Sequence, residues 1–195
     1  MNWKTLVFAA LIGFGLIQHL QTRPVEPGQG VVAPDLPRQV DQQAAALQLK
    51  GYTLQPLQKF SVEARVLGTE RYSIGREAEL SPLDLALGWG QMSDSAVLEK
   101  IKISQSNRFY FWRVDEFPIP RRVIERSSAN MHMIPANVAM ARGLKSVRVG
   151  QVVRIDGWLV EAQASDGWRW RSSLSRDDSG AGGCEIVLVQ DLQIL

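Results

Sequence analysis

The chain has 195 residues, and its 22 Lys and Arg against 20 Asp and Glu give a formal net charge of +2. Hydrophobic residues make up 45% and charged residues 22%, ordinary values for a globular protein that exclude a chain disordered throughout. A single Cys excludes an internal disulfide framework and a Cys-rich zinc site. The near-neutral charge argues against a nucleic-acid binder that relies on bulk electrostatics.

The first 22 residues are typical of a signal anchor, an uncleaved transmembrane helix. Lys4 precedes an apolar run from Thr5 to Ile17, and the stretch of residues 3–20 approaches the roughly 17–25 residues that a spanning helix needs. A cleaved signal peptide is one alternative, but no small-x-small site follows Ile17. A buried core helix is another, but the run has no polar stripe. We therefore expect residues 3–20 to contact the lipid bilayer.

The charges that flank this segment predict its orientation. Lys4 and the α-amino group lie on the N-terminal side, whereas Arg23 alone lies close on the other side. Positive charge favours the cytoplasmic side of a membrane. The sequence thus predicts a single-pass protein of the bacterial inner membrane with its C-terminal domain in the periplasm.

Residues 23–50 are predicted to form a linker rich in Pro and Gln, and residues 51–195 a β-rich globular domain. The linker holds four of the nine prolines, which favour extended backbone. Its last part, residues 40–49, is rich in helix-forming Ala, Leu and Gln and predicts a short helix. About 145 residues remain after the linker, enough to bury one core.

Within the domain, residues 60–67 alternate between apolar and polar side chains, which is strand periodicity. Ser81 and Pro82 suit the start of a helix, so a short helix to Leu87 is expected. Strands are expected at residues 101–103 and 109–112, around a turn at residues 104–107.

The C-terminal third is the most clearly β-rich part of the chain. Residues 147–162 contain Gly157 at an expected bulge or bend, and Asp166-Gly167 is a strong turn signal. Residues 184–189 are apolar enough for a central strand. Several strands with short helices predict a mainly β fold, either an OB-like or partly open β-barrel or, as the alternative, a β-sandwich.

The segment of residues 127–136 holds the only His of the globular domain, His132. Asn130 and His132 are expected on one strand face, with Met131 and Met133 on the other. His132 is a candidate general base, which needs a nucleophile and an orienting acid. The alternative is a His that is hydrogen-bonded into the fold and holds two strands in register. The candidate catalytic partners are Asn130, Ser128, Asp177 and Asp178, and Asp84 and Asp94 are further candidate acids.

Trp168 and Trp170 alternate with Arg169 and Arg171, so the two residue types are expected on opposite strand faces. This pattern is a candidate binding platform, because aromatic rings stack on bases or sugars and Arg grips phosphate. Alternatively, the Trp residues fill the core and the Arg residues pair with acids on a neighbouring strand. A basic face that meets anionic lipid or another envelope component is a further candidate, with a solvated surface as the alternative; its residues are Arg121, Arg122, Arg126, Arg142, Lys145 and Arg148. The sequence predicts no metal site and no cofactor.

Three stretches resemble an uncharacterised family of membrane-anchored bacterial envelope proteins. They are LSPLDLALGWGQMSD (Leu80–Asp94), SANMHMIPA (Ser128–Ala136) and DGWRWRSSLSRDDSGAGGCE (Asp166–Glu185). The resemblance covers most of residues 51–190 and implies no activity and no site residues.

Three functions are compatible with these patterns. The first is a membrane-tethered periplasmic binding or assembly module, with an envelope protein, a lipid head group or a glycan as its target. The second is an envelope hydrolase that uses His132 as general base. The third is an OB-type nucleic-acid-binding domain, which fits poorly with the expected location. The missing catalytic signature and the expected tether favour the first, and thus a protein that is not an enzyme.

Overall fold

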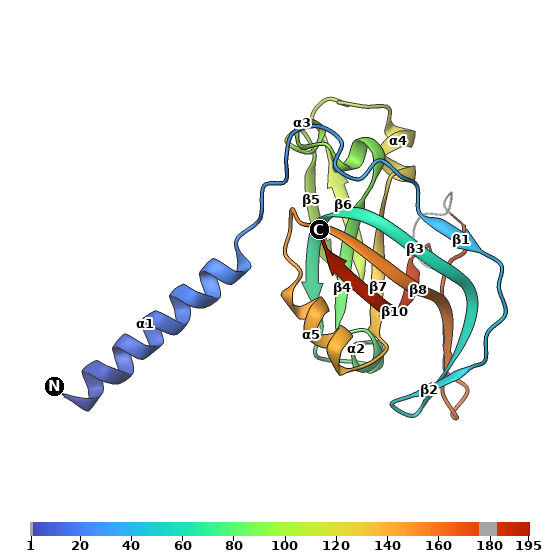
Figure 1. Cartoon of the computed structure of the whole chain (residues 1–195), viewed down its shortest axis with the longest axis horizontal. Coiled ribbons are helices and arrows are strands. Elements are labelled where there is room, and N and C mark those ends of the chain that lie inside the picture. The colour runs from blue at the N-terminus through green and yellow to red at the C-terminus, as the bar shows by residue number, and fades with distance from the viewer. Residues whose placement is uncertain (1, 176–182) are drawn as a thin grey trace.

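The computed structural model describes residues 2–175 and 183–195, without the side chains of residues 14 and 16–22. The elements follow one another along the chain as drawn in Figure 1. They are α1 (Trp3–Thr22), β1 (Arg38–Val40), β2 (Leu47–Leu49), β3 (Tyr52–Arg71), α2 (Arg76–Leu80), β4 (Leu83–Gly88), the 3-10 helix η1 (Gly90–Ser93), α3 (Ser95–Leu98), β5 (Lys102–Ser106), β6 (Phe109–Arg113), α4 (Arg121–Arg126), β7 (Ser128–Pro135), α5 (Val138–Ser146), β8 (Val152–Gln163), β9 (Arg169–Arg171) and β10 (Glu185–Ile194).

Eight strands form one sheet in the order β1-β3-β4-β7-β10-β8-β9, with β2 paired to β3. Because β3 also pairs with β8, the sheet turns back on itself and is partly closed. Strands β7 and β10 run parallel, while β3 runs antiparallel to both β4 and β8. The predicted mainly β fold is therefore confirmed.

Strand β3 is 20 residues long and takes part in both ends of this closure. It pairs with β8 from Thr53 to Arg65 and with β4 from Arg65 to Arg71. The register shifts between Pro56 and Gln58, and again shortly before Gly68. Bulges bend a strand and increase its twist, so these irregularities let one strand serve two partners.

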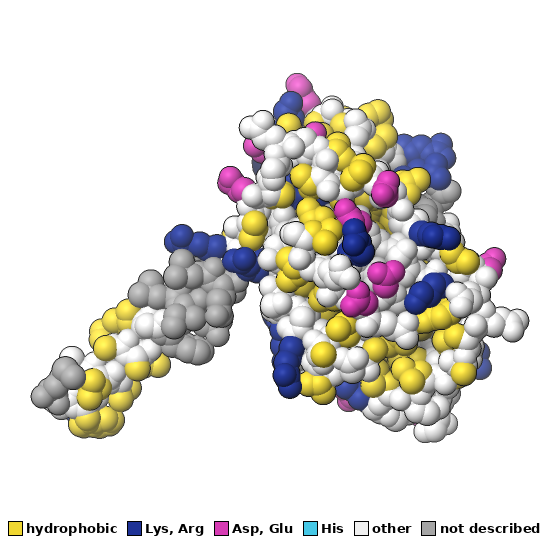
Figure 2. All heavy atoms as spheres, in the orientation of Figure 1, with side chains coloured by type: hydrophobic (Ala, Val, Ile, Leu, Met, Phe, Trp, Pro, Cys, Tyr) yellow, Lys and Arg dark blue, Asp and Glu magenta, His cyan; other side chains and the backbone are white. Residues whose placement is uncertain are grey.

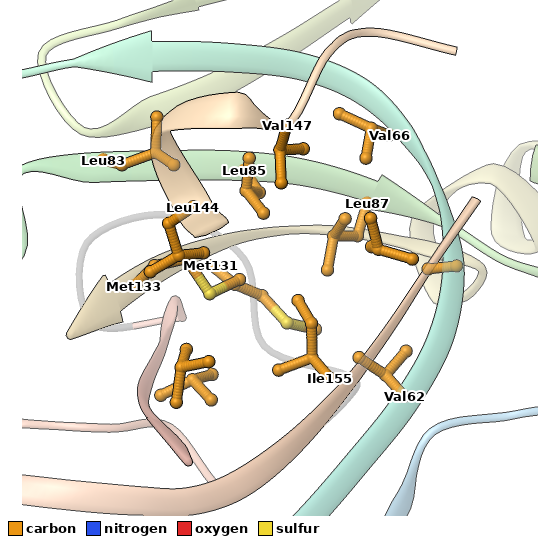
Figure 3. Packing of buried hydrophobic residues seen from close by; sticks show 14 of the residues in the cluster. Val62, Val66, Leu83, Leu85, Leu87, Met131, Met133, Leu144, Val147 and Ile155 are labelled. Atoms are coloured by element: carbon orange, nitrogen blue, oxygen red, sulfur yellow. The ribbon is translucent and has the colours of Figure 1, made fainter. Parts of the chain in front are cut away.

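The core lies inside the curved sheet (Figure 3). Along β3 the alternate residues Phe60, Val62, Ala64 and Val66 are buried in it, which confirms the predicted strand periodicity. Met131 and Met133 of β7 join them, and they lie on the face opposite Asn130 and His132, as the sequence predicted. The core also contains Leu83, Leu85, Leu87, Val153, Ile155, Leu159, Val187 and Val189.

The helix predicted after Ser81 is wrong. Residues 83–88 form β4, every residue of which is buried, and the short helix α2 ends before them. A short, mostly apolar segment fits a buried strand as well as a helix. Here residues 83–88, which include Asp84, pair with both β3 and β7, and this pairing makes them a strand.

Strands β5 and β6 form a hairpin that is inserted between β4 and β7 in the sequence. Its inner face packs on the outer side of the sheet through Ile103, Tyr110 and Trp112. The turn consists of Asn107 and Arg108, so the strands extend beyond the turn expected at residues 104–107.

The predicted linker lies against the domain. The Val25 N–H donates to the Val149 carbonyl at 2.8 Å, and Ala33 is fully buried, with its N–H donating to Ser93 Oγ at 3.1 Å. Residues 38–40 and 47–49 pair with β3, so the helix expected at residues 40–49 is wrong. Main-chain hydrogen bonds to an available sheet edge outweigh the local helix propensity of this segment.

Helix α1 extends away from the body (Figure 1). Along its described part the large apolar side chains Trp3, Leu6, Val7, Phe8, Leu11 and Ile12 are exposed. In the part of the chain that the structure describes, no helix meets the length and hydropathy that a bilayer span requires.

Candidate functional site

Three polar side chains lie on the outer face of the two neighbouring strands β4 and β7. Asp84 on β4 pairs in register with His132 on β7, and Asn130 stands two residues before His132 on the same face. Asp84 is fully buried, and Asn130 and His132 are 5% and 4% exposed. Burying ionisable and amide groups is costly unless each finds a partner, so this placement needs an explanation.

Arg108 supplies that partner from the turn of the β5–β6 hairpin. Its Nη1 donates to Asp84 Oδ1 at 2.7 Å, and Asn130 Nδ2 lies 3.3 Å from Asp84 Oδ2. The side chain of Arg108 is itself 19% exposed. A charge pair of this kind, with further hydrogen bonds to the carboxylate, satisfies a buried Asp. We refer to Asp84, Arg108, Asn130 and His132 as the Asp84 cluster.

Arg108 is attached to the sheet by its main chain as well as by its guanidinium. Its N–H donates to the Tyr72 hydroxyl oxygen at 2.8 Å, and its carbonyl accepts from Asn130 Nδ2 at 3.0 Å. The guanidinium carbon lies 3.8 Å from the centre of the Tyr72 ring. Gln105 adds a hydrogen bond from Nε2 to Asn130 Oδ1 at 2.7 Å. The cluster therefore fixes the position of the inserted hairpin.

The turn itself carries backbone strain. Asn107 and Arg108 have φ values of 51° and 70°, the left-handed region that favours Gly or Asn. Asn tolerates this region, whereas Arg at the second position is unusual. Strain of this kind persists only where the surroundings over-determine the conformation. The hydrogen bonds and the ion pair of Arg108 hold the turn in this conformation.

His132 is enclosed between the acid and an aromatic ring. Its Nδ1 lies 2.9 Å from Asp84 Oδ1, but the angle between the N–H and the carboxylate oxygen is unsuitable for a hydrogen bond. Among the described residues Nδ1 has no other hydrogen-bond partner. The imidazole lies 5.0 Å from the Trp170 ring, tilted by 39°. A protonated imidazole would form an ion pair with Asp84.

The structure brings together part of the predicted catalytic set. Asn130 and His132 share the cluster, and the acid that meets His132 is Asp84. Ser128 lies four residues before His132 along β7, about 13 Å at the rise of a strand, and its hydroxyl donates to the Ile124 carbonyl at 2.7 Å. Asp177 and Asp178 lie outside the described residues.

Residue patterns alone do not assign Arg108, Tyr72 or Gln105 to this site. One local signal was present, an Arg after Asn at the turn of a two-strand pattern, where Gly is the usual residue. Nothing local indicates that the Arg reaches an Asp that precedes it by 24 residues.

Strand β9 and the residue before it place Trp168 and Trp170 toward the domain and Arg169 and Arg171 outward. Trp168 packs edge-on against Tyr52 with ring centres 5.6 Å apart, and Trp170 packs beside His132. Arg171 Nη1 donates to Glu161 Oε2 at 2.5 Å, and Arg169 lies 3.8 Å from the same carboxylate. The hydrogen bond from Arg171 lowers the pKa of Glu161. The Trp rings thus pack against the domain and the Arg residues pair with an acid on the neighbouring strand β8, which is the alternative that the sequence left open to a binding platform.

The outer face of the β5–β6 hairpin is exposed and partly aromatic. Phe109 and Phe111 are 38% and 50% exposed, with ring centres 6.3 Å apart. Phe117 follows at 54% exposure and packs edge-on against Trp112. Exposed neighbouring aromatic side chains are typical of a surface that another molecule covers. We refer to Phe109 and Phe111, which alternate along β6 with the inward-facing Tyr110 and Trp112, as the hairpin surface.

A cleft of about 370 Å³ lies elsewhere, between the segment that holds Asp35 and Arg38 and the strands β3 and β8. Its walls include Glu63 and Arg154, which pair at 2.7 Å. None of the predicted site residues that the structure describes lines this cleft. The described residues also hold no group of three or more His, Cys, Asp or Glu placed to bind a metal.

Tyr110 gives the attachment of the hairpin a pH dependence. Burial raises the pKa of Tyr110 to about 12, and its hydroxyl donates to Ser128 Oγ at 3.2 Å. In the unfolded chain the group titrates near 10. Between about pH 10 and 12 the unfolded state therefore binds fewer protons, and the free energy of unfolding falls as pH rises.

We expect this loss to reach about 2–3 kcal/mol by pH 12, measured by urea denaturation at a series of pH values. Tyr110→Phe should be less stable at pH 8 but should show a shallower decline above pH 10. An unchanged alkaline decline in the variant would rule out Tyr110 as its source.

No family model, no curated protein and no solved structure matches this chain. The resemblance to membrane-anchored envelope proteins stays a prediction from the sequence.

Proposed function

We propose that this chain is a membrane-tethered binding or assembly module that holds a protein of the bacterial envelope on its hairpin surface. Helix α1 anchors it in the inner membrane in a single pass, and the domain faces the periplasm. The observation that carries this proposal is that a buried charged cluster fixes the hairpin while Phe109 and Phe111 on its outer face stay exposed.

The Asp84 cluster supports this role because forming it costs free energy of folding. Burying Asp84 and straining the turn at Arg108 both oppose folding. Their joint effect is to hold one hairpin in a defined position against the sheet. A preformed surface loses less conformational entropy when it binds, so rigid presentation of Phe109 and Phe111 favours affinity.

The enzyme alternative receives less support from the same geometry. The carboxylate of Asp84 beside His132 resembles the orienting acid of a catalytic base. However, His132 is 4% exposed and covered by Trp170, and Ser128 is too far along β7 to be its nucleophile. A general base must reach the proton that it removes.

We further propose that the partly closed sheet is OB-like. Support comes from the pairing path β3-β4-β7-β10-β8 and back to β3, with β7 parallel to β10 and α5 placed between β7 and β8. In OB folds the face of the second and third strands binds ligands. The corresponding face here, β4 and β7, is covered by the hairpin, which argues for protein binding on the hairpin over nucleic-acid binding on the sheet.

The membrane anchor is supported by the apolar run of residues 5–17 and by the exposed apolar side chains of α1, although the described part of α1 alone does not reach the length and hydropathy of a bilayer span. Helix α1 has 20 residues, roughly 30 Å at the rise of an α-helix, which matches the hydrocarbon thickness of a bilayer. Its described large apolar side chains are exposed, and in the sequence the apolar run continues as far as Ile17. Water exposure of Phe8, Leu11 and Ile12 would be unfavourable without lipid around them.

Site-specific photo-crosslinking in intact cells tests the binding role. A benzoylphenylalanine at position 111 should give one discrete crosslinked protein, whereas the same group at the exposed position 193 should not. With the photoreactive group kept at 111, Phe109→Ser should reduce the product by at least about fivefold, because it removes an apolar side chain from the contact.

The matched control is Arg169→Gln with Arg171→Gln, which alters the β9 surface predicted from the sequence. We expect the crosslink at position 111 to persist in it. Loss of the product in this variant, but not in Phe109→Ser, would move the binding surface to β9. Absence of any product at position 111 in cells that express the protein would refute the proposal.

A further inference from the structure

The chain joins the domain very soon after α1 ends. Helix α1 ends at Thr22, and the Val25 N–H already donates to the Val149 carbonyl at 2.8 Å. Three residues span at most about 10 Å, even when fully extended. If α1 lies in a bilayer, the part of the domain around Val149 is therefore held close to the lipid head groups.

This part of the domain is basic. Arg142 and Lys145 are exposed and lie three residues apart on α5, hence on the same side of the helix. Arg148 follows shortly after α5, and an Arg71 guanidinium N–H donates to the Lys145 carbonyl at 2.7 Å. Among the described residues no Asp or Glu forms an ion pair with these four side chains. We refer to Arg71, Arg142, Lys145 and Arg148 as the α5 surface.

Figure 2 shows Lys and Arg side chains where α1 meets the body and along the adjoining edge. We propose that the α5 surface docks on the anionic lipid head groups of the membrane that holds α1. This inference rests on the proposed tether. Each basic side chain near an anionic bilayer contributes to attraction, and a tether of three residues keeps the local concentration of head groups high.

The sequence pattern groups Arg142, Lys145 and Arg148 of this surface with Arg121, Arg122 and Arg126 in one candidate basic face. The structure separates the two sets, because α4 and α5 lie at opposite ends of the body (Figure 1). Arg121 is also paired with Glu125 at 2.8 Å. The basic residues of α4 therefore serve as a control for effects of overall charge.

The test uses the full chain in lipid vesicles of phosphatidylcholine alone or with phosphatidylglycerol. Hydrogen exchange of the segment 138–149 should slow at least about fivefold when phosphatidylglycerol is present, the effect of about one basic contact. This protection should disappear at high salt, which screens exposed charges. Arg142→Gln with Lys145→Gln and Arg148→Gln should abolish it. The α4 variant, Arg121→Gln and Arg122→Gln combined with Arg113→Gln on β6 to match the number of charges removed, should keep it.

Equal exchange in the two lipids, in a chain that stays with the vesicles through an alkaline wash, would overturn the docking and leave the tether intact. Equal loss of protection in the α5 and α4 variants would overturn it as well. A chain that leaves the vesicles in the wash would overturn the proposed tether and the docking with it.

Discussion

Asp84→Ala is expected to lower the free energy of unfolding by about 3–5 kcal/mol, the cost of breaking a buried ion pair by removing one partner. The substitution leaves the guanidinium of Arg108 without its carboxylate and Asn130 without one acceptor. The strained turn then loses the contact that fixes it. Urea denaturation with a common m-value measures the change.

The double variant Asp84→Leu with Arg108→Met provides the first control. It removes both charges. Its free energy of unfolding should therefore exceed, by at least about 2 kcal/mol, the value predicted by adding the separate losses of Asp84→Leu and Arg108→Met. The second control is Arg154→Gln, which breaks the exposed pair with Glu63 and should cost at most about 1 kcal/mol. Additive effects at Asp84 and Arg108 would show that the two side chains do not act as a pair.

Gly157→Ala is expected to cost at least about 3 kcal/mol or to prevent folding, because the added methyl group has no space. Gly157 lies in β8 between Phe60 of β3 and Val189 of β10. A Cβ at this position would collide with the main-chain carbonyl of Leu188. That carbonyl belongs to the sheet and cannot move without disturbing the closure of β8 against β10.

Gly143→Ala in α5 is the matched control. Its Cβ would meet only the end of the Leu192 side chain at 3.2 Å, a flexible group that can shift. The gain in helix propensity offsets this crowding, so we expect a change within about 1 kcal/mol. Comparable losses in the two variants, measured by thermal unfolding, would contradict a steric role for Gly157 in the closure.

The residue pattern around His132 predicts part of the site and leaves the rest to the tertiary structure. The alternation around His132 places Asn130 and His132 on one face and Met131 and Met133 on the other, and the structure confirms this. The spacing could not choose the acid that meets His132. Asp84 does so because β4 lies beside β7, a relation that neither strand encodes locally.

The sequence by itself determined the β-rich character of the domain and which residues of β3 and β7 share a face. Those features depend on a two-residue period, which each strand carries in its own side chains. Only the tertiary structure decided that residues 83–88 are a strand, that Arg108 reaches Asp84, and that the segment after Val25 lies on the domain. Each of these depends on a contact between distant parts of the chain, and main-chain hydrogen bonds, which almost any residue can make, leave no pattern in the sequence.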